Sequence, residues 1–198
     1  MSFSEIKEIS PRKQEILDAA QQLFSEKGYV AASMRELAQM LSIQPASLYS
    51  HYPSKDEILW EIALRAARSF YQKVMPIAEN KQLPTYDRMR AMMQAHTHAI
   101  IANINASAIF FKEWKRLEDD KRNRFAEIIS TYEGTFIAVL KEGADQGIFR
   151  PGNTRFFTSM LLSSVNWLPA WYRPDGKMSP EEIAEAAADF MLNGVSVQ

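Results

Sequence analysis

The sequence contains no cysteine. This absence excludes disulfide bonds, thiolate nucleophiles and metal sites built on cysteine, and it fits a reducing cytoplasm. An excess of charge of one sign is also missing, because 23 Lys and Arg residues face 24 Asp and Glu residues, for a formal net charge of −1. The chain therefore has no global field that would attract nucleic acid or an anionic membrane, and any contact with nucleic acid must be local.

Long apolar runs are missing as well. No segment reaches the roughly 18 apolar residues that a membrane-spanning helix needs. The first residues lack the basic flank and apolar core of a signal peptide. We therefore expect no membrane partner and a cytoplasmic location, for a chain whose 198 residues are enough to bury a substantial core.

Glycine is scarce, with 7 residues, and apolar residues recur mainly at intervals of three and four. This periodicity predicts an all-α fold. We expect nine helices, three in an N-terminal head and six in a larger body. Their predicted ranges are 11–28, 34–41, 45–52, 54–75, 85–101, 106–117, 119–146, 153–172 and 179–193.

Capping signals support several of these helix starts. Ser10 followed by Pro11 reads as an N-cap and first helical residue. Capping boxes, with Ser at the cap and Glu three residues later, stand at Ser33, Ser54 and Ser179. We expect Gly28 and Gly147 to end helices, Thr85 to cap one, and Pro76 to end or kink another.

The second and third predicted helices are short and closely joined, which is typical of a helix-turn-helix unit whose second helix enters the DNA major groove. In the third helix, Leu48 is expected to face inward. The polar residues around it, Gln44, Ser47, Tyr49, Ser50 and His51, would face outward towards bases or phosphates. Spacing alone leaves a solvated three-helix bundle open, because residues 1–60 carry more acidic than basic side chains.

The order of residues in this head resembles the N-terminal domain of the tetracycline-repressor (TetR) family of bacterial transcription regulators. The matching runs are Ile16-Leu-Asp-Ala-Ala-Gln-Gln-Leu-Phe24, Lys27-Gly-Tyr29, Ser33-Met-Arg-Glu-Leu-Ala38 and Ile43-Gln-Pro-Ala-Ser-Leu-Tyr-Ser-His-Tyr-Pro-Ser-Lys55. The sequence departs from the family's commonest pattern at Ser42, where glycine often makes the turn, and at Gln44, where serine often caps the helix.

The resemblance implies a set of DNA-contacting residues. Bases would be read by Gln44, Pro45, Ala46, Tyr49 and Ser50. Phosphates would be held by Ser47, His51 and Lys55, with Ser33 and Arg35 also touching DNA. It further implies a helix-turn-helix DNA-binding domain at residues 1–53 and a ligand-binding and dimerisation domain at residues 54–198. The partners would be double-stranded operator DNA and a second copy of the chain.

The dimer is expected to form through the last two long helices, as in the family. Residues 153–172 are apolar on nearly every side, with Phe156, Phe157, Met160, Leu161, Val165 and Leu168 on one stripe. Packed against residues 179–193, they would form half of an intermolecular four-helix bundle. Coverage of both faces within one chain is the alternative.

The body also holds many adaptable apolar groups, which suit a pocket for a small hydrophobic effector. The residues we predict to bind it are Met89, Met93, His96, Phe110, Phe111, Trp114, Trp167 and Trp171. Ordinary core packing remains open for each one. No cofactor and no metal site are expected, since His96 and His98 lie two apart on a helix and face different directions.

Residues 166–183 resemble a subgroup of the family that controls fatty-acid, phenylacetate or steroid degradation and responds to acyl-coenzyme A thioesters. The resemblance implies an acyl-CoA effector. A helix stop at Pro174 and a turn at Asp175-Gly176 explain the same residues structurally. The basic side chains at 112–124 could meet coenzyme A phosphates, although a solvated, salt-bridged helix explains them as well.

Two other classes of function compete with a regulator. An enzyme lacks support, because the chain has no nucleophile motif, no phosphate-binding glycine loop and no His-Glu-x-x-His. A helical protein-protein adaptor without DNA binding remains open on spacing alone. The resemblance favours a ligand-responsive transcriptional repressor that is released from a palindromic operator by its effector.

Overall fold

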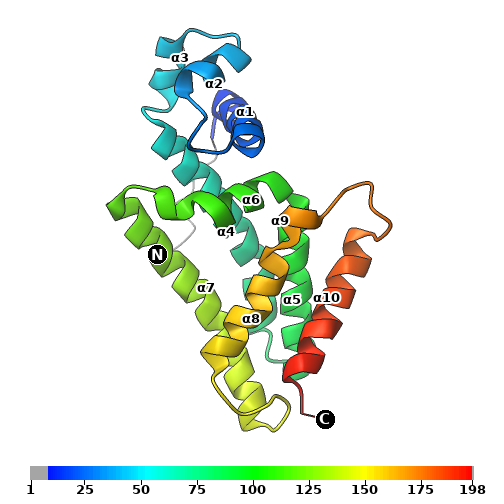
Figure 1. Cartoon of the computed structure of the whole chain (residues 1–198). Coiled ribbons are helices and arrows are strands. Elements are labelled where there is room, and N and C mark those ends of the chain that lie inside the picture. The colour runs from blue at the N-terminus through cyan, green and yellow to red at the C-terminus, as the bar shows by residue number, and fades with distance from the viewer. Residues whose placement is uncertain (1–8, 198) are drawn as a thin grey trace. The chain divides into compact units, whose positions relative to one another are not determined.

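The computed structural model describes residues 9–197, which fold into helices joined by short connections (Figure 1). None of the described helices is both long and apolar enough to cross a membrane. The described helices are α1 (Pro11–Lys27), α2 (Met34–Met40), α3 (Pro45–His51), α4 (Lys55–Glu79), α5 (Thr85–Ala102), α6 (Ile104–Glu113), α7 (Asp119–Asp145), α8 (Thr154–Asn166), α9 (Leu168–Trp171) and α10 (Pro180–Val195).

The predicted helix starts are confirmed where capping signals defined them. Ser10 accepts a hydrogen bond from the backbone N–H of Lys13, with Pro11 as the first helical residue. The capping boxes at Ser33 and Ser179 are complete. At Ser54 the hydroxyl accepts from the N–H of Glu57, but the Glu57 carboxylate binds Lys121 instead of closing the box.

Four predicted features in the body differ in the structure. Pro76 does not end α4: it lies inside the last turn of a helix that continues to Glu79, at the cost of the one hydrogen bond that its missing N–H would make. A kink at Pro76 stays a prediction. Thr85 does not cap α5: it is the first helical residue, and its hydroxyl donates to Glu142. The helix predicted to reach Leu117 becomes α6 followed by a 3₁₀ turn over Trp114–Arg116.

The fourth difference is a break in the helix predicted over residues 153–172. The chain leaves α8 after Asn166 and resumes at Leu168 as α9. Pro169 explains the break, because proline has no N–H to continue the ladder and is tolerated in a first helical turn, which is its place in α9. Trp167 therefore stands at a junction between two helices.

The described chain divides into two compact units. One contains residues 9–68 and 105–126, and the other contains residues 69–104 and 127–197. Helices α4 and α7 each contribute residues to both units. The predicted boundary of a DNA-binding domain at residue 53 stays a prediction.

In the first unit, the core is made where the short helices meet α1. Ile16 and Leu17 of α1 are fully buried, as is Leu48 of α3, while Leu37 of α2 is almost so. The inward position predicted for Leu48 is thereby confirmed. Tyr52 also packs inward, with an exposed fraction of 5%. The two short helices α2 and α3 are thus held against the longer α1 by one apolar layer.

In the second unit, α5 and α10 pack side by side (Figure 1). Arg90 on α5 pairs with Glu185 and Asp189 on α10. The C-terminal end is fixed to the connection after α7 by two backbone hydrogen bonds, from the N–H of Arg150 to Val195 and from the N–H of Val197 to Ile148. The last helix, predicted to end at Asn193 with Gly194 as its C-cap, continues to Val195, and Ser196 is the C-cap instead.

Candidate nucleic-acid interface and ligand site

Helix α3 presents one buried side chain and a broad exposed face. Leu48 is fully buried and holds the helix against the first unit. Six predicted base or phosphate contacts in or next to α3 are solvent-exposed, namely Gln44, Pro45, Ala46, Ser47, Tyr49 and Ser50. Five accessible side chains on one short helix, with a sixth at its N-cap, are the arrangement that groove reading requires.

Local hydrogen bonds leave part of this face available for a partner. Gln44 is the N-cap of α3 but makes no side-chain capping bond, so its amide is not committed to the helix end. The hydroxyl of Ser50 donates to the carbonyl of Ser47 at 2.7 Å. Tyr49 has an exposed fraction of 49%. The Gln44 amide and the Tyr49 phenol are therefore the long polar side chains available for contacts with bases.

The turn between α2 and α3 contains a strained residue. Ser42 has a φ of 53°, and within residues 9–197 no other non-glycine residue has a positive φ. Its N–H bonds the carbonyl of Gln39, and the N–H of Ile43 bonds that of Ala38. The sequence departure noted at Ser42 thus falls on a backbone conformation that favours glycine.

At the start of α2, Ser33 is used by the helix itself. Its hydroxyl accepts from the N–H of Glu36 at 3.2 Å and donates to the Glu36 carboxylate at 2.8 Å. A hydrogen bond from Lys27 is the main cause that lowers the pKa of Glu36. Arg35, the second residue of α2, is exposed. Arg35 is therefore the cation in this region that is placed to meet solvent or a phosphate.

The last two predicted DNA contacts, His51 and Lys55, are half-buried. The ammonium group of Lys55 donates to the carbonyls of Tyr29 at 2.7 Å, Val30 at 3.3 Å and Ala32 at 2.7 Å. These bonds use the three donors that a lysine has. Phosphate contacts by either residue stay predictions.

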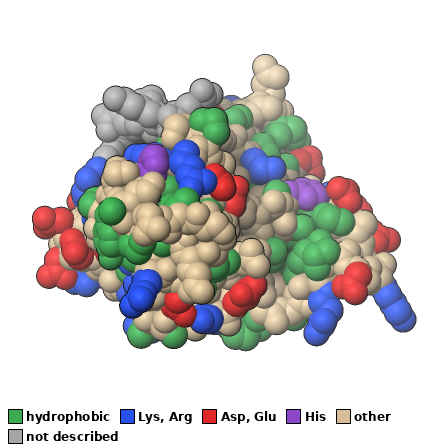
Figure 2. Space-filling model, turned by 90° about the horizontal axis from the view of Figure 1, so that it is seen from above, with side chains coloured by type: hydrophobic (Ala, Val, Ile, Leu, Met, Phe, Trp, Pro, Cys, Tyr) green, Lys and Arg blue, Asp and Glu red, His purple; other side chains and the backbone are tan. Residues whose placement is uncertain are grey.

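The charge pattern agrees with local rather than global attraction. In the space-filling view, basic and acidic side chains are interspersed on the visible face, without one large basic field (Figure 2). Several basic groups of the first unit are already paired, such as Arg12 with Glu15 and Lys27 with Glu36. Specific contacts from α2 and α3 must then supply much of any affinity for DNA.

The predicted ligand residues fall into groups in different units. Met89, Met93 and His96 lie on the buried face of α5 in the second unit. His96 has two hydrogen-bond partners there: Nδ1 lies 2.8 Å from the Tyr132 hydroxyl and Nε2 lies 2.9 Å from Asn166 Oδ1. We call His96, Tyr132 and Asn166 the polar trio.

The polar trio is neutral and enclosed by aromatic rings. Burial lowers the pKa of His96 to about 4 and raises that of Tyr132 well above 10. In the neutral imidazole, Nε2–H donates a hydrogen bond to Asn166 Oδ1, while Nδ1 accepts a hydrogen bond from the Tyr132 hydroxyl. The rings of Phe70 and Phe136 lie 5.1 and 6.2 Å from His96. A hydrogen-bonding centre in such surroundings discriminates strongly between ligands that can and cannot pair with it.

The predicted residues of α6 and the following turn lie in the first unit. The ring of Phe110 contacts those of Phe111 at 4.9 Å and Phe125 at 5.4 Å, and Trp114 contacts Phe125 at 5.8 Å. Phe125 in turn meets Trp60 of α4 at 5.9 Å. These side chains form an aromatic cluster that ties α6 and α7 to α4 within the first unit, and their part in a ligand site stays a prediction.

Trp167 and Trp171 differ from the other predicted ligand residues because they are exposed, with fractions of 69% and 53%. Core packing is therefore the wrong interpretation for these two. Further exposed apolar side chains stand on the same region of sequence, namely Phe156 and Met160 of α8 and Phe190 of α10. By contrast, Leu161, Val165 and Leu168, predicted to share the interface stripe, are buried within the chain.

The sequence analysis did not assign Asn166, Phe70 or Tyr132 to the ligand site. A lone amide at the end of an apolar helix was the available signal for Asn166, since a buried amide needs a partner. Tyr132 and Phe136 are four apart on α7, which places them on one face. Within residues 9–197, no group of three His, Asp or Glu side chains could hold a metal ion.

Comparisons with known proteins match both parts of the chain. A family model described as "Bacterial regulatory proteins, tetR family" matches residues 16–62, and one described as "Tetracyclin repressor-like, C-terminal domain" matches residues 82–195. The transcriptional repressor KstR2 of Rhodococcus jostii (strain RHA1) is 28% identical over 189 residues, which are 94% of this chain and 92% of the relative.

Two solved structures extend the likeness. The TetR family transcriptional regulator PfmR from Thermus thermophilus is 34% identical with a TM-score of 0.81, covering 90% of this chain and 97% of that one. AibR in complex with isovaleryl coenzyme A and operator DNA has a TM-score of 0.80 at 24% identity, covering 93% of this chain and 98% of that one. At that identity, the second likeness speaks for the fold.

Proposed function

The chain belongs to the TetR family of bacterial transcriptional regulators, and on that premise we propose that it is a homodimeric repressor released from its operator by an acyl-coenzyme A thioester. It is a DNA-binding regulator and not an enzyme, because the family model for the C-terminal domain covers more than half of the chain. A protein-protein adaptor without DNA binding is disfavoured because the model of the tetR family matches residues 16–62. We propose a cytoplasmic location, where operator DNA is found.

The exposed face of α3 is the observation that carries DNA reading. In the proposed complex, Gln44 and Tyr49 approach base edges in the major groove, while Arg35, Ser47 and His51 hold the flanking phosphates. Ser33 would contact a phosphate only by exchanging its hydroxyl's bond to the Glu36 carboxylate. Gln44 is suited to a bidentate pair with adenine, and Arg35 to a phosphate. Reading by two copies is needed because one seven-residue helix covers only a few base pairs.

Operator binding can be tested by fluorescence anisotropy on a duplex selected from a random library. Gln44→Ala is expected to relax the sequence preference at one base position, at a cost of about 1 to 3 kcal/mol. Arg35→Met is expected to weaken binding to all sequences alike and to reduce the salt slope by about 0.9 per lost phosphate contact. Ser25→Ala, exposed on α1, serves as the matched control. Unchanged preference and slope in both variants would refute this assignment.

The homodimer is supported by the exposed apolar side chains of α8 and α10. Phe190 is 82% exposed, and Phe156 and Met160 are 56% and 54% exposed. Large apolar side chains exposed to this extent on two helices are typical of an interface. We propose that α8 and α10 of two copies form an intermolecular four-helix bundle, which sets the spacing of the two α3 helices on a two-fold operator.

The effector class is supported by the relatives and by the polar trio. The solved AibR complex contains isovaleryl coenzyme A, a thioester with a short branched acyl chain. In this chain, the Tyr132 hydroxyl donates a hydrogen bond to His96. In the proposed complex it donates that hydrogen bond to a thioester carbonyl instead. Met89 and Met93, on the same face of α5, would adapt to the acyl chain. We propose that Trp167 and Trp171 meet the remainder of the effector.

Operator release tests this proposal with a panel of isovaleryl-CoA, longer acyl-CoA thioesters, the matching free acids and coenzyme A alone. We expect thioesters to release the duplex and coenzyme A alone to leave it bound. Tyr132→Phe removes only the hydroxyl. It is expected to raise the thioester concentration needed for half-maximal release about tenfold or more, without changing operator affinity in the absence of thioester. Release by coenzyme A alone, or an equal response of Tyr132→Phe and the parent, contradicts the effector assignment.

A further inference from the structure

Lys55 has an unusual environment for a residue at the start of a helix in a DNA-binding head. Its ammonium group is enclosed by three carbonyl oxygens of residues 29, 30 and 32, at 2.7, 3.3 and 2.7 Å. It also lies over the ring of Tyr29, 4.5 Å from the centroid. Burial lowers the pKa of this ammonium group, but the three carbonyl oxygens and the ring face still occupy its donors and hold it in place.

The carbonyls that Lys55 binds belong to the connection between α1 and α2. This connection has no regular secondary structure, so its polar backbone groups depend on partners from other elements. It leads directly into Ser33 and Arg35. The position of these two predicted DNA contacts is therefore set by how the connection is held.

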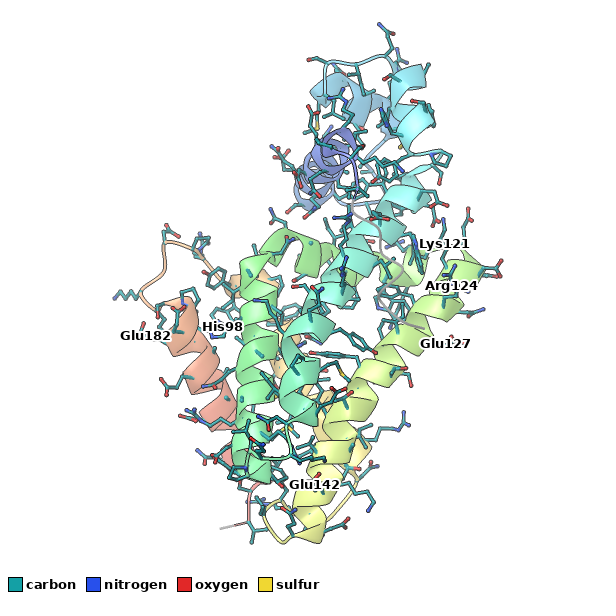
Figure 3. All side chains as sticks on the ribbon, turned by 180° about the vertical axis from the view of Figure 1, so that it is seen from behind. His98, Lys121, Arg124, Glu127, Glu142 and Glu182 are labelled. Carbon is teal, nitrogen blue, oxygen red and sulfur yellow. The ribbon has the colours of Figure 1, made fainter. Side chains whose placement is uncertain are left out.

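The two residues after Lys55 hold a different element. Asp56 is 9% exposed and accepts from the backbone N–H of Glu118 at 3.1 Å and from the ammonium of Lys121 at 2.5 Å. Glu57 accepts from the same ammonium at 2.7 Å. Figure 3 shows Lys121 in the first turns of α7. These contacts all lie within the first compact unit.

The first turn of α4 thus holds two elements in place, each through side chains of a different charge sign. A cation binds the carbonyls before α2, and two carboxylates bind the start of α7. Lys121 is partly buried between its two acceptors, and their hydrogen bonds raise its pKa although burial alone lowers it. Breaking such a partly buried pair leaves an uncompensated charge, so the arrangement is expected to be rigid.

We propose that Lys55 is a positioning residue for operator binding, which sets the α1–α2 connection and through it Ser33 and Arg35, and that it does not bind phosphate itself. The inference rests on the proposed function, since it concerns the same DNA interface. It differs from the phosphate contact that the family resemblance implies for Lys55. The two roles place different demands on the side chain.

Lysine reactivity in the unaltered protein separates the two roles. The protein is treated briefly with an amine-acetylating reagent, free and bound to its selected operator duplex, and modification is measured by mass spectrometry. A positioning Lys55 reacts slowly in both states, because its donors are engaged inside the protein. A phosphate-binding Lys55 reacts readily in the free protein and is protected by the duplex. Lys112, which is exposed, reports full reactivity in the same sample.

Substitution gives a second, independent measurement. A phosphate contact tolerates Lys55→Arg, because guanidinium binds phosphate well, whereas three carbonyls around one compact ammonium do not fit a planar fork. The positioning role predicts that Lys55→Arg loses operator affinity about as far as Lys55→Met does, on the order of tenfold. Hydrogen exchange of the peptide spanning residues 28–34 is expected to accelerate in both variants and to stay unchanged in Arg35→Met.

The outcomes are distinct. Ready acetylation of Lys55 in the free protein, or parental affinity and exchange in Lys55→Arg with loss in Lys55→Met, would overturn the positioning role. If the Lys55 variants do not fold, the acetylation result on the parent protein still decides. If the parent binds no duplex at all, the proposed function fails, while the reactivity of Lys55 in the free protein still tests its internal bonds.

Discussion

At the scale of single residues, Ser42 is where backbone strain and DNA geometry meet. Its φ of 53° lies in the left-handed region, which costs a residue with a Cβ about 1 to 2 kcal/mol. Glycine removes that cost but gains freedom in the unfolded chain. Ser42→Gly is expected to stabilise the protein by about 0.5 kcal/mol in urea unfolding. Gly147→Ser, the reverse change at a φ of 72°, is expected to destabilise it. A destabilising Ser42→Gly would contradict the argument.

Gly143 is required for a different reason, namely close packing. A Cβ at this position in α7 would lie 2.2 Å from the ring of Phe149, a carbon contact that the buried ring cannot accommodate without shifting. Gly143→Ala should destabilise the protein by about 1 to 3 kcal/mol. The control is Gly134→Ala in the same helix, where nothing lies within 4 Å and alanine should stabilise by roughly 0.5 to 1 kcal/mol. Equal effects of the two substitutions on the unfolding midpoint would refute this account.

His96 makes stability depend on pH. Burial lowers its folded-state pKa to about 4, below the ordinary 6.5, so the unfolded chain binds the proton more tightly. The stabilising contribution is complete above pH 6.5 and is lost as the pH falls from there towards 4. The loss should be on the order of 2 kcal/mol by pH 5.

Urea unfolding of the parent and of His96→Gln at pH 7 and pH 5 measures this loss. Glutamine keeps a donor and an acceptor but does not titrate, so the variant should lose less stability over the same interval. The comparison between the two proteins removes the contributions that they share. An identical fall in both proteins would exclude His96 as the source.

At the scale of elements, capping made the sequence informative. Ser10, Ser33 and Ser179 marked helix starts because each cap needs only residues three apart, and all three were confirmed. Pro76 and Pro169 were harder to interpret. Whether a proline ends a helix depends on whether its missing N–H falls within a first turn, a last turn or the interior, and that is decided by neighbouring elements.

The candidate sites divide in the same way. The exposed face of α3 followed from an ordered motif, because Leu48 alone faces inward on so short a helix. The polar trio could not be predicted, since it joins residues from α5, α7 and α8 that are far apart in sequence. Likewise, the partners of Lys55 are backbone carbonyls, and carbonyl direction in an irregular connection leaves no trace in residue type.

The exposed face of α10 leads to a prediction about assembly. Phe190→Glu places a charge where a second copy should pack, so we expect a folded monomer in sedimentation velocity with unchanged helical circular dichroism. Val30→Glu is the control, because Val30 is 66% exposed but lies in the first unit, outside the proposed interface. This variant should remain dimeric. A dimeric Phe190→Glu, or a monomeric Val30→Glu, would place the interface elsewhere.

At the scale of the whole molecule, the proposed switch is a coupling between two binding sites. A coupling free energy of about 1 to 3 kcal/mol corresponds to a 5- to 150-fold loss of operator affinity when the effector is bound. Linkage is reciprocal, so saturating operator must weaken effector binding by the same factor. This holds whatever structural route connects the sites.

We therefore expect two measured ratios to agree. One is the operator dissociation constant with and without the thioester that releases DNA most strongly, by anisotropy. The other is the dissociation constant of that thioester with and without operator duplex, by calorimetry at the same salt concentration, because DNA affinity depends on salt. Tyr132→Phe should weaken thioester binding in both states while leaving each ratio nearly unchanged, since it removes affinity rather than coupling. Because reciprocity is a thermodynamic necessity, the decisive outcome is the size of the ratios: values near one in both measurements would refute the proposed coupling and release by the thioester.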